Sequence, residues 1–109
     1  MWGVKGVYVL KMKNDKYYIG QSKNIGNRLF SHLVYSQGIV KRYGYRKYIK
    51  HIEYNKNTKE REDLENKLTL EYIDKYGNKN VYGGVFVNTK RRTLKYINNF
   101  KKNLNKDLN

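Results

Sequence analysis

The first apolar segment of the chain, Gly6–Met12 (GVYVLKM), is rich in residues that favour β-structure and predicts a strand. Asn14 and Asp15 follow it and are typical of a tight turn. The next apolar segment, residues 16–20 (KYYIG), predicts a second strand that returns beside the first. The chain therefore begins with a predicted β-hairpin.

A helix is predicted directly after this hairpin, because apolar residues recur at helical spacing up to about Val34. These residues are Ile25, Leu29 and Leu33. Ser22 or Asn24 offers the side-chain oxygen that caps the first free amides of such a helix. Residues 35–47 mix glycines, basic residues and aromatic residues, and they predict a loop or a broken helix.

A third strand is predicted over residues 48–54, and a longer helix follows it. Asn57 and Glu60 are spaced as an N-cap and its partner. The helix should run to about Tyr76, with Gly77 as its stop.

The last part of the chain predicts two shorter elements. Residues 80–87 (NVYGGVFV) predict a short extended segment, and residues 88–109 carry apolar residues at helix-like spacing. The order β-β-α-β-α predicts an α/β (α+β) domain with a small three-stranded antiparallel sheet flanked by helices. The 109 residues suit one such domain over residues 1–87, followed by a basic C-terminal helix or arm over residues 88–109.

The charge of the chain is strongly basic, with 24 Lys+Arg against 9 Asp+Glu and a formal net charge of +15. Such a field favours polyanions, above all nucleic acid. An AT-rich coding genome would also enrich lysine, so the charge alone identifies no site. The chain has no cysteine and two histidines, which excludes zinc–thiolate sites and histidine-rich metal clusters. No signal-peptide pattern or apolar run of transmembrane length occurs, so we expect an intracellular protein of the cytoplasm or the nucleoid or nucleus, without membrane contact.

Five short motifs occur in order along most of the chain. They are GVY at residues 6–8, YIG at residues 18–20, GQSKNIGNRLFSH at residues 20–32, LE at residues 64–65 and NVYGG at residues 80–84. Together they resemble the motifs of the GIY-YIG endonuclease family, with Val7 as a variant of the isoleucine in the first triplet. The resemblance implies a GIY-YIG-like nuclease domain over residues 1–87.

The resemblance implies catalytic roles for four residues, Tyr8, Tyr18, Arg28 and His32. In the family the tyrosine of the first triplet is implicated in activating water, often with a second tyrosine or the histidine. A free tyrosine titrates near pH ~10, so Tyr8 needs a nearby cation to act as a base, and Arg28 is the candidate. Arg28 and His32 are four residues apart and share one helix face, where Arg28 would hold the scissile phosphate. The alternative interpretations are core packing for the two rings and a solvated helix face for the pair.

Glu65 is the predicted ligand of Mg²⁺ or Mn²⁺. On the predicted helix its carboxylate emerges within the apolar face, where a lone carboxylate is expensive to bury without a cation. One carboxylate and several waters commonly hold Mg²⁺ beside a phosphate. An ion pair with Arg61, one turn earlier, is the competing interpretation. The sequence also departs from the family here, because the acidic residue expected four positions before Ile73 is Thr69.

Two accessory residues complete the predicted site. Asn80 is equally consistent with a place near the metal or phosphate and with turn chemistry before Gly83 and Gly84. Ser22 is better explained as a helix cap than as a nucleophile.

Basic residues interleaved with aromatic rings predict contacts with phosphates and bases. The predicted nucleic-acid-binding residues are Lys41, Arg42, Arg46, Lys47, Lys90, Arg91 and Arg92. For the first four, a solvated loop is the alternative. For the C-terminal three, the alternative is a helix that docks on the domain through Leu94, Ile97 and Phe100.

We therefore expect a metal-dependent endonuclease that hydrolyses phosphodiester bonds in DNA, with double-stranded DNA as the partner. The departure at Thr69 motivates an alternative, a catalytically silent nucleic-acid-binding module of the same fold. An RNA-binding accessory protein is a third interpretation. The sequence does not distinguish a homing endonuclease-like role from repair, restriction or branched-DNA processing, and it predicts no oligomeric state.

Overall fold

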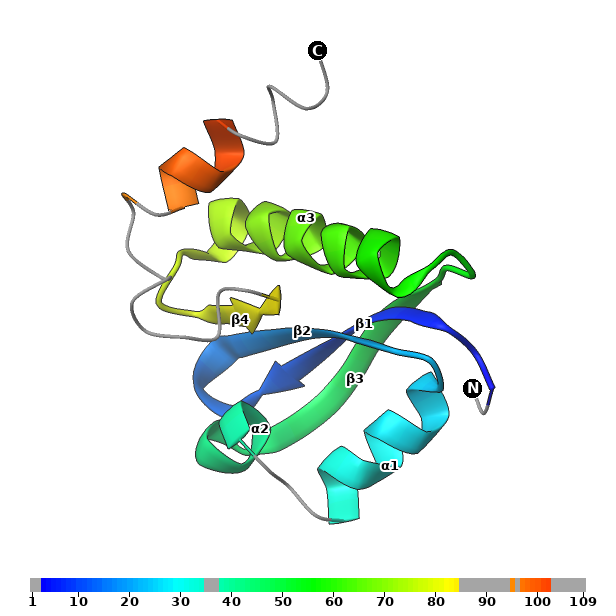
Figure 1. Cartoon of the computed structure of the whole chain (residues 1–109). Coiled ribbons are helices and arrows are strands. Elements are labelled where there is room, and N and C mark those ends of the chain that lie inside the picture. The colour runs from blue at the N-terminus through cyan, green and yellow to red at the C-terminus, as the bar shows by residue number, and fades with distance from the viewer. Residues whose placement is uncertain (1–2, 35–37, 85–94, 96, 103–109) are drawn as a thin grey trace.

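A mixed four-stranded sheet forms the centre of the computed structural model, which describes residues 3–34, 38–84, 95 and 97–102 (Figure 1). The strands lie in the order β3-β1-β2-β4. In chain order, the elements are β1 (Gly6–Met12), the 3₁₀ turn η1 (Lys13–Asp15), β2 (Lys16–Ser22), α1 (Ile25–Val34), α2 (Gly38–Tyr43), β3 (Tyr45–Glu53), α3 (Thr58–Tyr76) and β4 (Val81–Gly83).

The N-terminal hairpin forms as predicted. β1 has the predicted bounds and pairs antiparallel with β2. Asn14 and Asp15 both adopt positive φ, at 62° and 57°, in the connecting turn. Asparagine and aspartate tolerate this left-handed conformation better than most residues, which explains their place here. β2 continues for two residues beyond the prediction, through Gln21 and Ser22.

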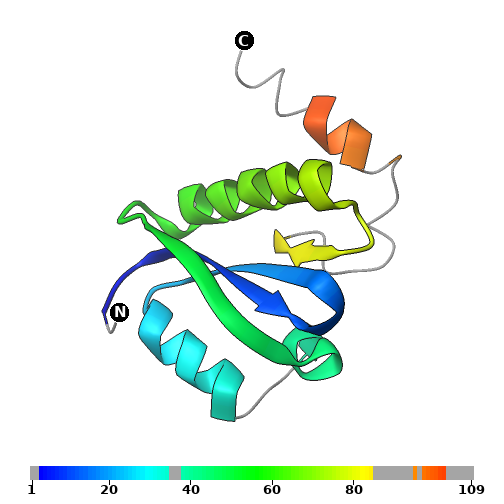
Figure 2. The same cartoon turned by 180° about the vertical axis from the view of Figure 1, so that it is seen from behind.

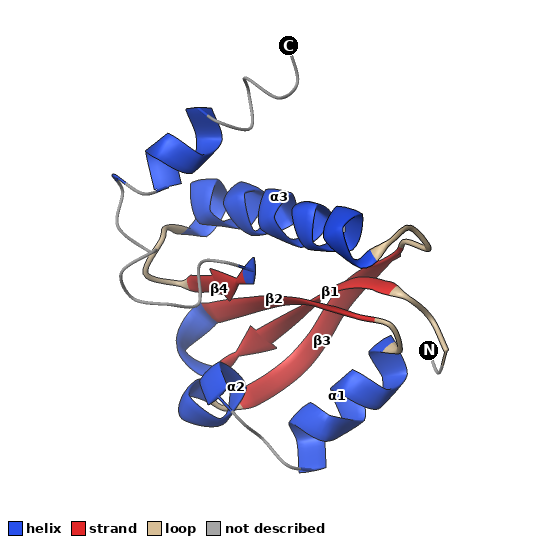
Figure 3. Ribbon diagram, viewed as in Figure 1, coloured by secondary structure: helices blue, strands red, loops and turns tan. Residues whose placement is uncertain are grey.

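The prediction of a purely antiparallel sheet of three strands is wrong. β4 adds a fourth strand at the edge of β2 and runs parallel to it, with Val81 opposite Tyr17 (Figure 3). The amide of Tyr17 donates to the carbonyl of Asn80 at 2.8 Å and so begins this pairing. A strand of three residues has too little sequence pattern to predict its partner, because tertiary packing decides the pairing.

Helices cover the two faces of the sheet. α3 lies along one face and α1 and α2 lie on the other, as the view from behind also shows (Figure 2). Successive side chains of β1 point to opposite faces of the sheet, so the core has two parts. Val7 and Val9 pack with the apolar face of α3, whereas Tyr8, Leu10 and Met12 pack toward α1 and α2.

The segment predicted as a loop or broken helix over residues 35–47 is ordered in its later part as α2 and the start of β3. Gly44 separates the two elements with a φ of +80°, and its amide donates to the carbonyl of Val40 at 2.8 Å. β3 thus starts three residues earlier than predicted. The glycine acts as a helix stop, a role that the prediction did not give to it.

The C-terminal residues 97–102 are helical and pack against α3. Ile97 is buried in the cluster that includes Leu70 and Ile73 of α3, Phe100 packs against this cluster, and Lys101 forms an ion pair with Asp74. Residues 97–102 therefore form a helix that docks on the domain and do not form a free arm. None of the helices in the described ranges has the length and hydrophobicity needed to cross a membrane.

The ends of α3 follow the predicted caps. The amide of Glu60 donates to Oδ1 of Asn57 at 2.9 Å, and Gly77 ends the helix with a φ of 91°. Because α3 carries Glu65, the capping residues at its ends also determine where the helix presents this carboxylate.

Replacing the N-cap residue should destabilise the domain. Asn57→Ala removes the acceptor for the Glu60 amide, and we expect a loss of about 1 kcal/mol in the free energy of unfolding. Urea denaturation followed by circular dichroism measures this, with the exposed Asn55→Ala as the matched control. Equal stability of the two variants would contradict the capping role.

Candidate active site

The ring of Tyr8 lies directly over the backbone of Gly20. The two residues are partners in the β1–β2 ladder. A β-carbon placed on Gly20 would lie 2.5 Å from both Cζ and Oη of Tyr8. Real side-chain contacts are not that short, so glycine is the residue type that leaves room for this ring.

Tyr8, Tyr18 and His32 form a cluster of three rings on the sheet face that α1 covers. The ring centroids of Tyr8 and Tyr18 are 6.3 Å apart, and that of His32 is 5.9 Å from Tyr8 and 5.5 Å from Tyr18. The Tyr8 hydroxyl and Nε2 of His32 share a hydrogen bond of 2.9 Å. The structure thus brings three of the predicted catalytic side chains together.

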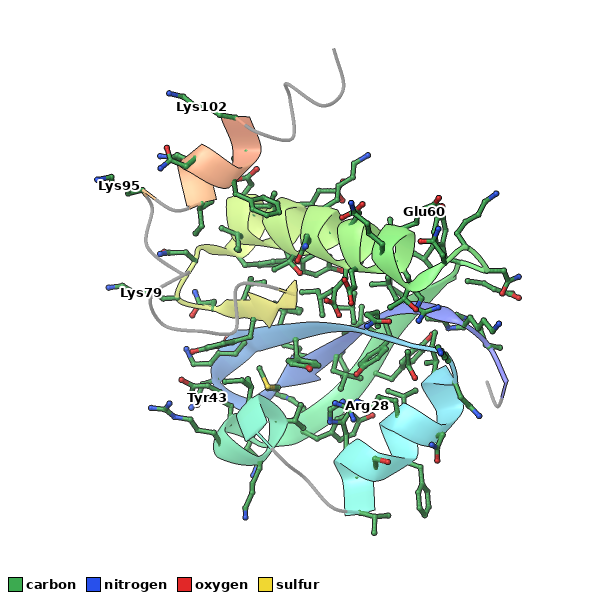
Figure 4. The ribbon with its side chains drawn as sticks, in the orientation of Figure 1. Arg28, Tyr43, Glu60, Lys79, Lys95 and Lys102 are labelled. Carbon is green, nitrogen blue, oxygen red and sulfur yellow. The ribbon has the colours of Figure 1, made fainter. Side chains whose placement is uncertain are left out.

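Arg28 is the fourth member of this group. It extends from α1 toward the sheet, one turn before His32 (Figure 4). Its guanidinium hydrogen-bonds the hydroxyls of Tyr8 and Tyr18, and both contacts lower the pKa of the phenol concerned. One cation therefore serves both phenols.

Burial nevertheless decides the protonation of the cluster. Desolvation raises the pKa of Tyr8 and of Tyr18 above the ordinary value, against the opposing effect of Arg28. Desolvation and the nearby charge of Arg28 lower the pKa of His32 to about 4. At neutral pH the cluster therefore holds neutral phenols and a neutral imidazole, and the imidazole is the available base.

The buried stripe of α1 differs from the predicted one. His32 is 6% exposed, whereas Leu33 is 57% exposed. Ile25, Leu29 and His32 thus face the sheet, because the helix is turned to place Arg28 and His32 against the two phenols. The apolar spacing predicted the helix correctly but assigned Leu33 to the wrong side.

Glu65 approaches the same group from α3. Its charge raises the pKa of both Tyr8 and Tyr18, so the carboxylate acts on the two phenols. Burial, followed by repulsion from Glu62, raises the pKa of Glu65 itself to about 7, against a hydrogen bond from the backbone of Gln21.

The competing ion pair between Glu65 and Arg61 does not form. The ion pairs within the described residues are Lys11–Asp15 and Lys101–Asp74. Arg61 is 3% exposed and donates from Nε to Oε1 of Gln21 at 2.7 Å. Glu65 therefore keeps a carboxylate without a cationic partner in the described part of the chain.

Gln21 is a residue that the sequence did not single out. Its side chain binds Arg61 and its backbone binds Glu65, so it links β2 to the start of α3. The predicted strand ends at Gly20, one residue before Gln21, whereas β2 continues to Ser22. Strand alternation continued by one residue would have directed Gln21 toward α3.

Thr69, where the family pattern would put the acidic residue, lies inside the core. It is 0% exposed, and its hydroxyl donates to the carbonyl of Glu65 at 2.7 Å. A β-carbon on Gly83 would come within 2.6 Å of this hydroxyl. Position 69 is therefore covered by β4, and the helix presents its carboxylate one turn earlier, at Glu65.

Gly84 brings the end of β4 against Glu65 and Asn66. It has a φ of +50°, and a β-carbon there would lie 1.9 Å from Oδ1 of Asn66 and 3.4 Å from Oε1 of Glu65. β4 pairs with β2 only as far as Ile19. The carboxylate thus lies near the edge of β2 next to Gly20, close enough for its charge to raise the pKa of both phenols on the other face. Asn66 is a second residue that the motifs did not indicate.

The two accessory residues have structural partners. Nδ2 of Asn80 donates to the carbonyl of Tyr76 at 2.9 Å, which closes the turn after α3. Oγ of Ser22 accepts from the amide of Asn24 at 3.0 Å, and Oδ1 of Asn24 caps α1 by accepting from Asn27. Turn chemistry thus accounts for Asn80 and also for Ser22, whereas Asn24 is the residue that caps α1.

The predicted nucleic-acid-binding residues are divided between elements. Lys41 and Arg42 are exposed on α2, where Arg42 lies 5.5 Å from the centre of the Tyr43 ring. Arg46 and Lys47 are exposed on β3, and Lys47 pairs with Lys11 on the face toward α3. Lys90, Arg91 and Arg92 lie outside the described residues.

The donor set suits one hard divalent cation. Within the described residues, no group of three or more histidine, aspartate or glutamate side chains could hold a metal ion. Glu65 offers a single carboxylate, and its raised pKa reflects a charge that a cation would stabilise. A magnesium site with one protein carboxylate fits this arrangement, with waters and a phosphate as further ligands.

Comparisons of the chain with models of protein families, with curated proteins and with solved structures found no match.

A side chain at position 20 should displace Tyr8. We expect Gly20→Ala to lower the free energy of unfolding by about 1–3 kcal/mol, because its methyl group overlaps the ring. In a Tyr8→Ala background the same change should have a much smaller effect. Denaturation of the four proteins in this cycle measures the coupling, and equal losses in both backgrounds would contradict the contact.

Removing the charge of Glu65 should stabilise the protein at alkaline pH. The folded-state pKa of about 7 exceeds the reference value of 4.5, so ionisation makes stability fall as pH rises through this range. Without divalent metal, Glu65→Gln should match the wild type near pH 4 and exceed it by roughly 1–3 kcal/mol at pH 8, after allowance for solvent screening.

Chemical denaturation at the two pH values measures this difference. Glu71→Gln, on the exposed side of the same helix, is the matched control. A stability difference between Glu65→Gln and the wild type that does not change with pH would contradict the burial of this charge.

Proposed function

We propose that the protein is a divalent-metal-dependent endonuclease of the GIY-YIG type that hydrolyses phosphodiester bonds in double-stranded DNA. One observation carries the proposal. A hydrogen-bonded phenol–imidazole pair, a guanidinium and a carboxylate without a cationic partner in the described residues act on one another at one edge of the sheet. These are the groups that phosphodiester hydrolysis needs.

Tyr8 and His32 would together activate the attacking water. The raised pKa of Tyr8 makes its phenolate a poor resting base, but its hydroxyl is hydrogen-bonded to a neutral imidazole. The hydroxyl oxygen can accept a proton from water while its own proton passes to Nε2 of His32. The low pKa of His32 keeps the imidazole unprotonated at neutral pH, so Nε2 can take up this proton transiently in the transition state.

Arg28 supplies positive charge at the same place. Its guanidinium already contacts two neutral phenol oxygens, and a phosphate oxygen is a stronger acceptor. Arg28 would hold the scissile phosphate and stabilise the charge that develops on it in the transition state. Tyr18 keeps the guanidinium in position from the β2 side.

Glu65 would hold the divalent metal at the other side of the phosphate. When bound, Mg²⁺ or Mn²⁺ would polarise the phosphate and stabilise the departing oxygen. The buried position of Thr69 and the half-buried position of Glu65 support Glu65 as the residue that would hold the metal.

The charge along the chain supports a polyanionic substrate. No acidic residue occurs between Asp15 and Glu53, a stretch that forms β2, α1, α2 and most of β3. Six of the nine acidic residues lie in α3, and Glu60 points outward from it (Figure 4). The side of the molecule opposite α3 therefore has the electrostatic character to face DNA.

The purified protein should nick or linearise supercoiled plasmid when Mg²⁺ is added. Arg28→Ala and Glu65→Gln should each lower the cleavage rate by at least about 100-fold, because each removes a group that stabilises the transition state. Glu71→Gln, on the exposed side of α3, should cleave like the wild type.

Supercoiled, linear, branched and single-stranded DNA should be tested in parallel. Undiminished cleavage by both site variants would refute the site and indicate a contaminating nuclease. Salt-sensitive binding of DNA without cleavage of any form would instead support the catalytically silent binding module.

A further inference from the structure

A β-bulge in β3 places a second tyrosine–histidine pair beside the candidate site. In the β1–β3 ladder, Val9 pairs with Lys50 but Leu10 pairs with Tyr48, so the chain contains an extra residue between them. Two residues three positions apart, Tyr48 and His51, therefore point to the same face of the sheet. Bulges often re-aim side chains in this way next to functional sites.

His51 is the direct cross-strand neighbour of Tyr8. Opposite residues in an antiparallel pair share a face, with β-carbons about 4.5–5.5 Å apart. Because the Tyr8 ring leans over Gly20, on its other side, His51 lies next to the phenol cluster without entering it.

The hydrogen bond with Tyr48 directs the imidazole of His51. The Tyr48 hydroxyl is hydrogen-bonded to Nδ1, and burial raises the pKa of this phenol, so the phenol is protonated and can donate. A phenol that donates to Nδ1 leaves the ring proton on Nε2. Nε2 has no hydrogen-bond partner in the described part of the chain, and His51 is half-exposed.

We propose that Nε2 of His51 donates a hydrogen bond to the phosphate next to the one that is cut, and that Tyr48 positions the imidazole for this contact. The inference rests on the proposed function, because it assigns the path of the cleaved strand. The strand would run from the Gly20 end of β2 toward the half-exposed His51 on β3. The ligand is a backbone phosphodiester, so the contact is independent of base sequence.

The charges around His51 favour a phosphate at this position. The acid-free stretch described above includes His51, and Lys41 and Arg42 are exposed on α2, which covers the same sheet face. Lys50, the preceding residue, points to the opposite face, where it lies 5.8 Å from the centre of the Tyr72 ring. Lys50 lies on the same strand and also carries an N–H donor, but it points in the other direction, so it provides a matched control.

Binding of a fluorescent duplex oligonucleotide without divalent metal tests the contact separately from catalysis. His51→Ala should weaken binding roughly tenfold, as the loss of a hydrogen bond to a charged group would, and Tyr48→Phe should weaken it about threefold. His51→Gln, which keeps a donor, should recover part of the loss. Lys50→Ala should change affinity by less than about twofold. Thermal melting of each variant verifies that it is folded.

A modified substrate then tests the assigned phosphate. Once the cut position on a duplex is mapped, a methylphosphonate replaces the phosphate on either side of it in turn. At one of the two positions the wild type should lose about tenfold in kcat/KM, while His51→Ala should lose little more. Equal losses in both proteins at both positions would overturn the assignment.

The two proposals can fail separately. If the wild type cleaves DNA but His51→Ala binds and cleaves normally, His51 has no role and the proposed function stands. If no DNA is cleaved, the proposed function fails, and the binding measurements still decide whether His51 contacts a phosphodiester. Equal binding by His51→Ala and Lys50→Ala would refute this contact.

Discussion

The ring of Tyr8 rests against the α-carbon of Gly20, where no larger residue leaves it room, and the geometry of the site follows from that contact. The ladder of β1 and β2 fixes which residues face each other, and the missing side chain lets the phenol lean across the neighbouring strand. His32 and Arg28 then meet its hydroxyl from α1. A hairpin in another register would separate these groups.

The electrostatics of the site differ from those of an ordinary ion-pair network. Burial raises the pKa of the phenols and of Glu65 and lowers that of His32, so each titratable group favours its neutral form. Arg28 is the cation of the cluster, and it contacts neutral oxygens. Under the proposed function, a phosphate and a metal ion would bring the charges that the site itself lacks.

Local signals predicted much of the fold, and long-range packing decided the rest. The bounds of β1 and the caps of α3 at Asn57 and Gly77 follow from nearby residues. The parallel pairing of β4 depends on contacts between segments more than sixty residues apart, which no local pattern encodes. Motifs mark the candidate residues Tyr8 and Glu65, whereas Gln21 joins the candidate site through a strand that extends past its motif.

The carboxylate and the phenol cluster come from opposite ends of the domain sequence, since Tyr8 lies in β1 and Glu65 in α3. Early segments alone cannot assemble the site, because it requires α3 to dock on the completed sheet. During synthesis, an emerging chain therefore carries an incomplete set of reactive groups until most of the domain has left the ribosome. Local opening of α3 in the finished protein would separate the same groups again, so whatever chemistry the site performs is confined to the fully folded molecule.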